Sequence, residues 1–253
     1  MSAPHAREWA AVVLSPHLDD AALSLGGLSQ RLPEPRAVVT VHGGPPAAGA
    51  AVSEWDAACG FLSAREAYET RLAEDARACA VLGAEQVLLG HADNPYRCGG
   101  PLTAVDAFLA GLPPQTEIFV PLATNQRDHA AVRDRALGLV AGRRPRVYAD
   151  LPYTAVMPGW GTGSLDPASG GAAYRAMQER YALEVVHDVR LGGAEWARKR
   201  DAVLCYASQL APVAGMSEVG QLGPLLGHPG PLQFELVWEV VPRSATPGPR
   251  SAG

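Results

Sequence analysis

The sequence lacks the features that mark nucleic-acid-binding, membrane and secreted proteins. It has 21 Lys and Arg against 26 Asp and Glu, a formal net charge of −5, and its Arg residues are scattered between acidic ones. A nucleic-acid interface would instead show a basic stripe or patch. No apolar run reaches the ~20 residues that a spanning helix needs, and residues 1–9 show no basic segment followed by an apolar one. We therefore expect a cytoplasmic protein with a small-molecule partner and with no nucleic-acid or membrane partner.

Cysteine is scarce, and its spacing indicates neither a redox motif nor a disulfide framework. The four cysteines are Cys59, Cys79, Cys98 and Cys205, and no two are spaced as Cys-x-x-Cys. A chain of 253 residues, 47% of them hydrophobic, can bury a core without disulfide bonds. We therefore expect free thiols, most of them buried.

Short apolar or β-branched runs alternate with segments of helical periodicity, which is typical of an α/β protein. We expect strands at residues 11–15, 36–41, 86–89, 117–121 and 146–150, and an edge strand at 234–240. Helices are expected at residues 19–31, 63–82, 103–112, 128–140 and 194–209, with loops at 43–52 and 157–171. This alternation predicts a Rossmann-like, mostly parallel sheet flanked by helices. With no repeat or linker visible, we expect one domain over residues 1–243 and a disordered tail at 244–253.

Three polar residues, His17, Asp19 and Asp20, follow the first predicted strand within four positions. Ligands bind outside the carboxyl ends of the strands in an open parallel sheet, and this is such a position. One turn of chain can bring His17 and Asp20 to a common centre, where zinc accepts an imidazole nitrogen and a carboxylate oxygen. The alternative is a helix N-cap, in which an aspartate accepts hydrogen bonds from the first helical N–H groups. The set of three at a strand end favours a metal site.

A catalytic zinc site uses three protein ligands and a water, so a third ligand must come from elsewhere in the chain. His129 opens the helix predicted after the fourth strand, at the same edge of the sheet as His17. A lone histidine at a helix N-terminus more often has no special role. Its place on this edge makes His129 the natural third ligand.

These residues resemble the motifs of the PIG-L (LmbE-like) deacetylase family. Residues 15–27 are similar to its first motif, Pro-His-Pro-Asp-Asp followed by Gly-Gly, and Asp128-His129 matches the end of its His-x-Asp-His motif. Weaker matches are an Arg-x-x-Glu helix ending in Leu-Gly (71–83), a Leu-Pro-Tyr segment (151–153) and residues 199–209. The resemblance spans roughly residues 10–210.

The resemblance implies a Rossmann-like fold, one zinc ion and hydrolysis of N-acetyl groups on amino sugars or related amides. Carried over residue by residue, it makes His17, Asp20 and His129 the metal ligands. Asp19 would take a proton from the zinc-bound water, since a carboxylate beside the ligands that is not itself coordinated can act as a general base. Asp128 would orient a histidine or hold the loop.

The motifs depart from the family pattern at two positions. Leu18 replaces the second proline of the first motif, which removes no functional atom. Gln126 stands where the first histidine of His-x-Asp-His is expected. An amide can donate a hydrogen bond to an oxyanion but cannot carry a proton at neutral pH. Either Gln126 assists the oxyanion, or His42 or His91 takes that place.

Two further residues are candidates for substrate binding. Arg71 suits this role if its helix begins near the pocket, and the alternative is a solvated or salt-bridged helix arginine. Asp93 follows the third strand and could bond a substrate hydroxyl, the alternative being a turn-forming aspartate.

The function that we expect is a zinc-dependent N-deacetylase acting on an acylated amino sugar or an amino-sugar-containing natural product. The alternative is a family member that binds metal and ligand without deacetylation, for which Gln126 is the support. Dinucleotide binding is disfavoured because no Gly-x-Gly-x-x-Gly follows the first strand; Gly26-Gly27 would lie inside the first helix and serve close packing. A serine hydrolase lacks its Gly-x-Ser-x-Gly motif. The substrate, the identity of the divalent metal and homo-oligomer formation stay open.

Overall fold

A mostly parallel sheet of seven strands forms the centre of the computed structural model, which describes residues 8–94, 96, 100–124, 126–140, 143–162, 165, 172–215 and 225–243. The strand order is β3-β2-β1-β4-β5-β7-β6. Strands β1 to β5 pair in parallel, whereas β7 runs antiparallel between β5 and β6. The strands are β1 (Ala11–Ser15), β2 (Arg36–Thr40), β3 (Glu85–Leu88), β4 (Glu117–Pro121), β5 (Arg146–Tyr148), β6 (Tyr181–Arg190) and β7 (Phe234–Pro242).

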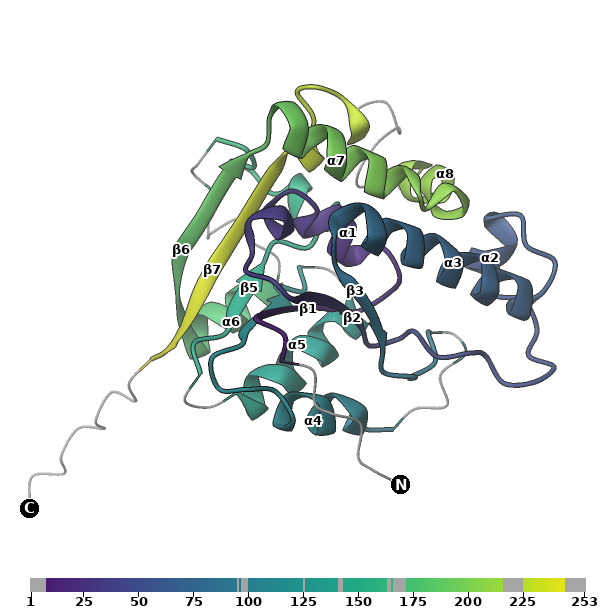
Figure 1. Cartoon of the computed structure of the whole chain (residues 1–253), viewed down its shortest axis with the longest axis horizontal. Coiled ribbons are helices and arrows are strands. Elements are labelled where there is room, and N and C mark those ends of the chain that lie inside the picture. Colours follow the sequence, from purple (N-terminus) through teal and green to yellow (C-terminus); the bar gives the residue numbers. More distant parts are fainter. Residues whose placement is uncertain are drawn as a thin grey trace, which may run out of the picture.

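Helices cover both faces of this sheet, so the predicted α/β architecture is confirmed. In Figure 1, α1, α3, α7 and α8 lie on one face, and α4 and α5 lie on the other. The helices are α1 (Asp20–Leu25), α2 (Glu54–Ala58), α3 (Ala64–Leu82), α4 (Thr103–Ala110), α5 (Arg127–Leu139), α6 (Ala172–Arg180), α7 (Gly193–Leu204) and α8 (Ala207–Gly215). Short 3-10 helices are η1 (Leu28–Arg31), η2 (Tyr153–Val156) and η4 (Pro231–Gln233).

Strand β1 is buried on both faces, as its continuous apolar run predicts. Val12 and Leu14 pack into the cluster that contains the apolar residues of α4 and α5. Ala11 and Val13 pack into the cluster on the α1 and α7 side. Because β1 lies between β2 and β4, this burial holds the start of the first motif at the centre of the sheet.

The predicted edge strand at 234–240 is wrong in its position. It forms β7, but β6 pairs along its outer side and is itself the edge. Residues 181–190 gave no strand signal because most of their side chains are partly or fully exposed and form no continuous apolar run. A mostly solvated edge strand carries little hydrophobic pattern, so the sequence could not place it.

Two predicted helices are also divided in the structure. The helix expected at 19–31 ends at Leu25, because the N–H groups of Gly27 and Leu28 donate to Glu235 instead of continuing the helix. Gly27 does serve close packing, since a Cβ there would lie 2.2 Å from the Leu191 side chain. The helix expected at 194–209 is split into α7 and α8, because the Tyr206 hydroxyl donates to Asp75 at 2.7 Å and turns the chain across α3.

The helix predicted at 63–82, the cysteines and the C-terminal tail are further expectations from the sequence. The helix at 63–82 is confirmed as α3, with Gly83 at φ 66° as its C-cap. Cys59, Cys79 and Cys205 are free, but only Cys79 is buried. Cys98 and the tail at 244–253 lie outside the described residues, and the single domain stays a prediction.

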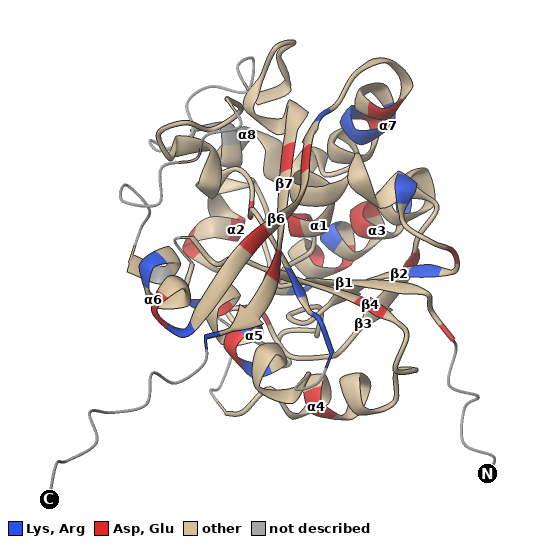
Figure 2. Cartoon of the chain, turned by 90° about the vertical axis from the view of Figure 1, so that its left-hand side faces the viewer, with Lys and Arg blue, Asp and Glu red and all other residues tan. Residues whose placement is uncertain are grey.

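Helices α6 and α7 carry charges of both signs (Figure 2), and the described part of the chain contains no candidate membrane span. Among these residues, no helix combines the length and apolar character needed to cross a membrane. Figure 2 shows acidic and basic residues side by side on α6 and α7.

A buried ion pair ties β7 to α7 and to the turn after α1. Glu235 accepts hydrogen bonds from the N–H groups of Gly27 at 2.8 Å and Leu28 at 2.5 Å, and from Lys199 Nζ at 2.7 Å. Glu235 and Lys199 are fully buried, and Lys199 is the chain's one lysine. Burial lowers the pKa of Lys199, although Glu235 opposes this effect. Removing the ammonium would leave a buried carboxylate without its counter-charge.

We therefore expect Lys199→Met to lower the free energy of unfolding by about 3–5 kcal/mol, since the buried Glu235 carboxylate loses its cation. Urea denaturation measures the change. Arg200→Met, on the exposed next residue of the same helix, serves as the control and should change stability by less than about 0.5 kcal/mol. Equal stability losses for the two variants would contradict this role of the ion pair.

Candidate active site

The candidate site lies where the parallel part of the sheet changes direction. From β1 the chain proceeds to β2 and β3 on one side, whereas β4 and β5 lie on the other side of β1. The loops that follow β1 and β4 therefore diverge and leave a crevice at the carboxyl ends of the strands, which is where open α/β sheets bind ligands. His17 and Asp20 come from the first of these loops and His129 from the start of α5 after β4.

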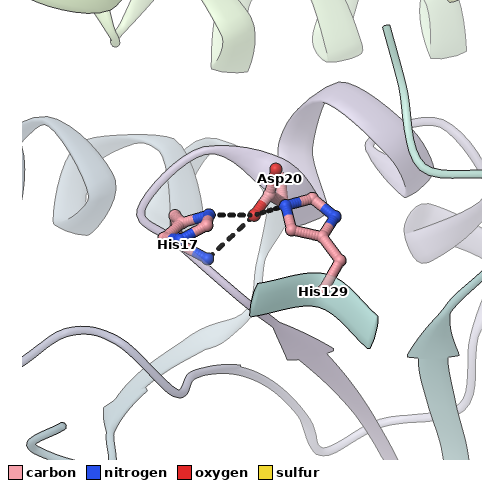
Figure 3. Close-up of side chains that lie close together, drawn as sticks. All are labelled: His17, Asp20 and His129. Atoms are coloured by element: carbon pink, nitrogen blue, oxygen red, sulfur yellow. Dashed lines mark hydrogen bonds and ion pairs between the residues drawn. The ribbon is translucent and has the colours of Figure 1, made fainter. Parts of the chain in front are cut away.

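The side chains of His17, Asp20 and His129 converge on one point (Figure 3). Asp20 Oδ2 lies 3.2 Å from His17 Nδ1 and 3.3 Å from His129 Nε2, and it accepts the His17 backbone N–H at 2.8 Å. One ligand atom from each of the three residues lies within 4.8 Å of the others. Two imidazole nitrogens and a carboxylate oxygen, with a fourth position left for water, form a donor set that suits a catalytic zinc.

The outer nitrogen of each imidazole faces a carboxylate. His17 Nε2 lies 3.3 Å from Asp93 and 3.6 Å from Asp128, and His129 Nδ1 lies 3.2 Å from Asp150. Each of these outer carboxylates favours a proton on the nitrogen that it faces, which would leave the inner nitrogen available to a metal. His17, Asp93 and Asp128 also form a second group with metal-binding spacing, but this group has one imidazole instead of two.

Asp150 is a residue of this site that the sequence reasoning missed. Its fully buried carboxylate also accepts hydrogen bonds from the Thr124 N–H at 3.0 Å and the Thr124 hydroxyl at 2.8 Å. Asp150 thus joins the loop after β4 to the residues directly after β5. The rule that pointed to His129 would have found it, since Asp150 also follows a parallel strand of the same edge.

Asp19 occupies the N-cap position of α1 but does not act as a cap. Its side chain makes no capping hydrogen bond, and Ser15 Oγ accepts the Ala21 N–H instead. The backbone of Asp19 has φ 150° and ψ −30°, a conformation that side-chain-bearing residues rarely adopt. Such strain is concentrated at functional sites. The helix-cap alternative therefore does not account for Asp19.

The two adjacent aspartates have opposite pKa shifts. Burial and, second, the Asp20 carboxylate raise the pKa of Asp19 to about 8. Burial also acts to raise the pKa of Asp20, but His129 and His17 outweigh it and hold this pKa well below its usual range. For His129, burial lowers the pKa, yet Asp20 and Asp150 outweigh it and raise the pKa to about 9. Asp20 is thus held in its charged form, whereas the burial of Asp19 favours its uptake of a proton.

A cavity of about 330 Å³ opens beside the cluster. The sequence-predicted residues His17, Asp19, Asp20, Arg71, Asp93, Gln126 and Asp128 all line it. His129 is almost fully buried behind them. The cavity wall also contains residues that the sequence reasoning did not single out as functional: Leu23, Trp55, Asn94, Pro152, Tyr153, Gln209 and Val213.

Arg71 is held by two carboxylates at the cavity wall. Its Nη1 lies 3.1 Å from Asp93 Oδ2 and 3.7 Å from Asp56 Oδ1, and the side chain is mostly buried. Burial acts to lower the pKa of Arg71, but these carboxylates and Asp19 raise it above its usual value. Arg71 is thus salt-bridged and also borders the cavity, so both sequence interpretations describe part of its position. The side chain of Asp93 faces Arg71 and His17 instead of merely forming a turn.

Gln126 and Tyr153 form a hydrogen-bonded pair in the cavity wall. Hydrogen bonding with the Gln126 side chain acts to lower the pKa of Tyr153. Burial is the larger effect and raises the pKa of Tyr153 above its usual range, so the phenol keeps its proton. The Tyr153 ring meets the His129 ring edge-on, with 5.7 Å between centroids.

His42 and His91 do not belong to the described cavity wall. His42 is buried and stacks on His17, with 5.5 Å between ring centroids, and burial lowers its pKa to about 4. His91 lies behind His42, at 6.4 Å between centroids. Neither histidine is therefore placed to assist an oxyanion in this cavity. Of the three residues that the sequence offered for this role, Gln126 is the one that lines the cavity.

The chain resembles solved deacetylase structures. The A40926 pseudoaglycone deacetylase is 25% identical and superposes with a TM-score of 0.68, covering 95% of this chain and 100% of the other. A triple mutant of a deacetylase of the teicoplanin biosynthetic pathway is 22% identical, with a TM-score of 0.71 and coverage of 93% and 99%.

A 4-carboxy-2-hydroxymuconate hydratase from Pseudomonas putida also shares the fold, at 17% identity, a TM-score of 0.55 and coverage of 94% and 98%. The fold by itself therefore does not fix the reaction. A comparison with curated proteins gave no match. The model of the family PIG-L, described as GlcNAc-PI de-N-acetylase, matches residues 12–139. This match covers half of the sequence and includes every proposed metal ligand, and we conclude that the chain belongs to the PIG-L family.

Proposed function

We propose that this chain is a zinc-dependent hydrolase that removes the acyl group from an acylated amino sugar or from a natural product that contains one. The observation that carries the proposal is the convergence of His17, Asp20 and His129 beside Asp19 at one cavity. Membership of a family described as a de-N-acetylase supports it, as does the likeness to the A40926 pseudoaglycone deacetylase.

In this proposal His17 Nδ1, Asp20 Oδ2 and His129 Nε2 hold the metal. A zinc ion bound there lowers the pKa of a coordinated water and polarises a carbonyl group. Asp93 and Asp128 hold the ring of His17, and Asp150 holds the ring of His129. Metal-binding histidines in proteins are commonly oriented by such carboxylates.

Asp19 is the general base of the proposed reaction. Its carboxylate accepts a proton from the attacking water, whose oxygen forms a bond to the amide carbon. The C–N bond then breaks, and Asp19 returns the proton to the leaving nitrogen. The products are a carboxylic acid and a free amine. Gln126, in the same cavity wall, is the sequence-derived candidate to stabilise the oxyanion.

The rest of the cavity wall suits a polyhydroxylated substrate. Arg71 and Asp93 present a charged donor and a charged acceptor whose positions are held by their mutual ion pair. Trp55 offers an aromatic ring, and its Nε1–H donates to Gln209 Oε1 at 2.8 Å, which ties α2 to α8 at the cavity. Sugars present hydroxyl groups and apolar ring faces, which match these two kinds of wall.

The purified protein should contain or take up about one zinc ion per chain, and His129→Ala should lose it, because two ligands alone bind zinc weakly. Elemental analysis after dialysis measures the content. His187→Ala, on the edge strand β6, removes a histidine away from the cavity and should keep the metal. A wild-type protein that holds no metal and gains none with added zinc would contradict the site.

Asp19→Asn should keep the zinc but lower the rate of amide hydrolysis by about 100- to 10,000-fold, because an amide cannot accept the proton of the attacking water. Steady-state kinetics together with metal analysis separate these two effects. Asp201→Asn, an exposed position on α7, is the matched control and should leave the rate unchanged. Full activity of Asp19→Asn would show that the base is another residue.

The reaction itself is tested by incubating the zinc-loaded protein with a panel of N-acetylated and longer-chain N-acylated amino sugars and glycopeptides. We expect stoichiometric release of free amine and carboxylic acid from at least one of them. Metal uptake and ligand binding without any release would instead favour the alternative of a family member that does not turn over its ligand.

A further inference from the structure

The cavity wall beside His129 carries a polar pair with no role in the proposed proton transfer. Tyr153 and Gln126 both line the cavity, and their side chains are hydrogen-bonded to each other. The Tyr153 ring packs edge-on against the His129 ring at 5.7 Å and 85°. Tyr153 therefore lies next to a proposed metal ligand, in the wall of the cavity that a substrate would enter.

An amide carbonyl that is attacked by water develops negative charge on its oxygen, and a positioned hydrogen-bond donor stabilises that charge. Two other donors of the cavity wall are engaged elsewhere. In the proposed function Arg71, paired with Asp93, contacts substrate hydroxyls, and the Trp55 N–H donates to Gln209. His42 and His91 do not line the described cavity. Tyr153 is the donor of the cavity wall whose ring contacts the His129 ring, and Gln126 is its hydrogen-bond partner.

Within this pair, the tyrosine is the group with a hydrogen to offer. When the Gln126 amide N–H donates to the phenolic oxygen, the phenolic hydrogen is left to face a substrate carbonyl. A donor that itself accepts a hydrogen bond becomes a stronger donor, because each bond polarises the next. Gln126 would then act through Tyr153 by fixing and polarising its hydroxyl.

Asp150 places the donor and the metal ligand on one scaffold. Its carboxylate faces His129 Nδ1, and its backbone carbonyl accepts the N–H of Thr154, the residue after Tyr153, at 2.9 Å. The Thr154 hydroxyl is also bonded to Asp150. The positions of His129 and Tyr153 are therefore set by the same buried residue, which gives the preorganisation that oxyanion stabilisation requires.

We propose that the Tyr153 hydroxyl is the oxyanion donor of this enzyme and that Gln126 is its positioning residue. The inference rests on the proposed amide hydrolysis. The hydroxyl donates to the carbonyl oxygen while the water oxygen bonds to the carbon, and it keeps its proton throughout. The C–N bond breaks as the oxyanion reforms the carbonyl, and the nitrogen takes its proton from Asp19.

The test is Tyr153→Phe, which keeps the ring against His129 and removes only the hydroxyl. With an acylated amino sugar that the wild type hydrolyses, we expect kcat to fall about 100- to 1,000-fold while KM and zinc content stay close to the wild-type values. A methylphosphonamidate analogue of that substrate, which mimics the tetrahedral oxyanion, should lose affinity by a similar factor. The affinity for the acetate product should not change.

Gln126→Leu, alone and combined with Tyr153→Phe in a double variant, tests whether the two residues act together. Gln126→Leu should lower kcat in the same direction, and the double variant should be little slower than Tyr153→Phe, because groups that act together are not additive. Tyr174→Phe is the matched control, since Tyr174 is buried against Trp238 in the core outside this cavity, and it should leave kcat unchanged.

Three outcomes overturn the inference, and they differ in what they mean for the proposed function. If the wild type hydrolyses its substrate and Tyr153→Phe keeps the wild-type kcat, the oxyanion donor is another group and the proposed function stands. If the zinc-loaded wild type hydrolyses no acylated amine, the proposed function fails and this inference fails with it. A fall in kcat that comes with loss of zinc or unchanged phosphonamidate affinity would assign Tyr153 a structural role instead.

Discussion

The carboxylate of Asp20 connects the two loops on which the site is built. It accepts the His17 N–H and lies between the inner nitrogens of His17 and His129, so it joins the loop after β1 to the start of α5. The outer nitrogens of both rings face carboxylates in turn. Carboxylates and imidazoles thus alternate in a mostly buried cluster, and the carboxylates outnumber the imidazoles. Such an arrangement fits a bound divalent cation far better than it fits a structural role.

The fold places these groups by a single rule. Each parallel strand from β1 to β5 delivers at least one of them at its carboxyl end: His17 after β1, His42 after β2, Asp93 after β3, Asp128 and His129 after β4, and Asp150 after β5. The groups divide by depth. Asp19, Gln126 and Tyr153 line the cavity where chemistry would occur, whereas His42 and Asp150 are buried and hold the rings in place. Loops form the wall of the cavity, and the rigid strand ends set the positions of these loops.

The sequence predicted the parallel sheet and the ligand candidates because both depend on local patterns. Buried strands are apolar runs, and His17, Asp19 and Asp20 stand together in one turn of chain. Asp150 and Tyr153 also lie close to the carboxyl end of a parallel strand, so the rule that pointed to His129 could have identified them. Trp55 and Gln209 could not be found by that rule, because α2 and α8 reach the cavity through tertiary contacts such as Tyr96 with Asp56 and Ser208 with Glu74. The exposed edge strand β6 had no apolar pattern to be recognised.

The backbone of Asp19 has an implication for attempts to engineer this protein. An aspartate at φ 150°, partly buried beside a second aspartate, is unfavourable for folding, and glycine reaches positive φ more readily than a residue with a side chain. Screens that select for heat resistance or expression would therefore enrich replacements of Asp19, the proposed general base. A thermostable variant of this chain obtained without an activity selection should be sequenced first at codon 19, where stability competes with the proposed catalytic role.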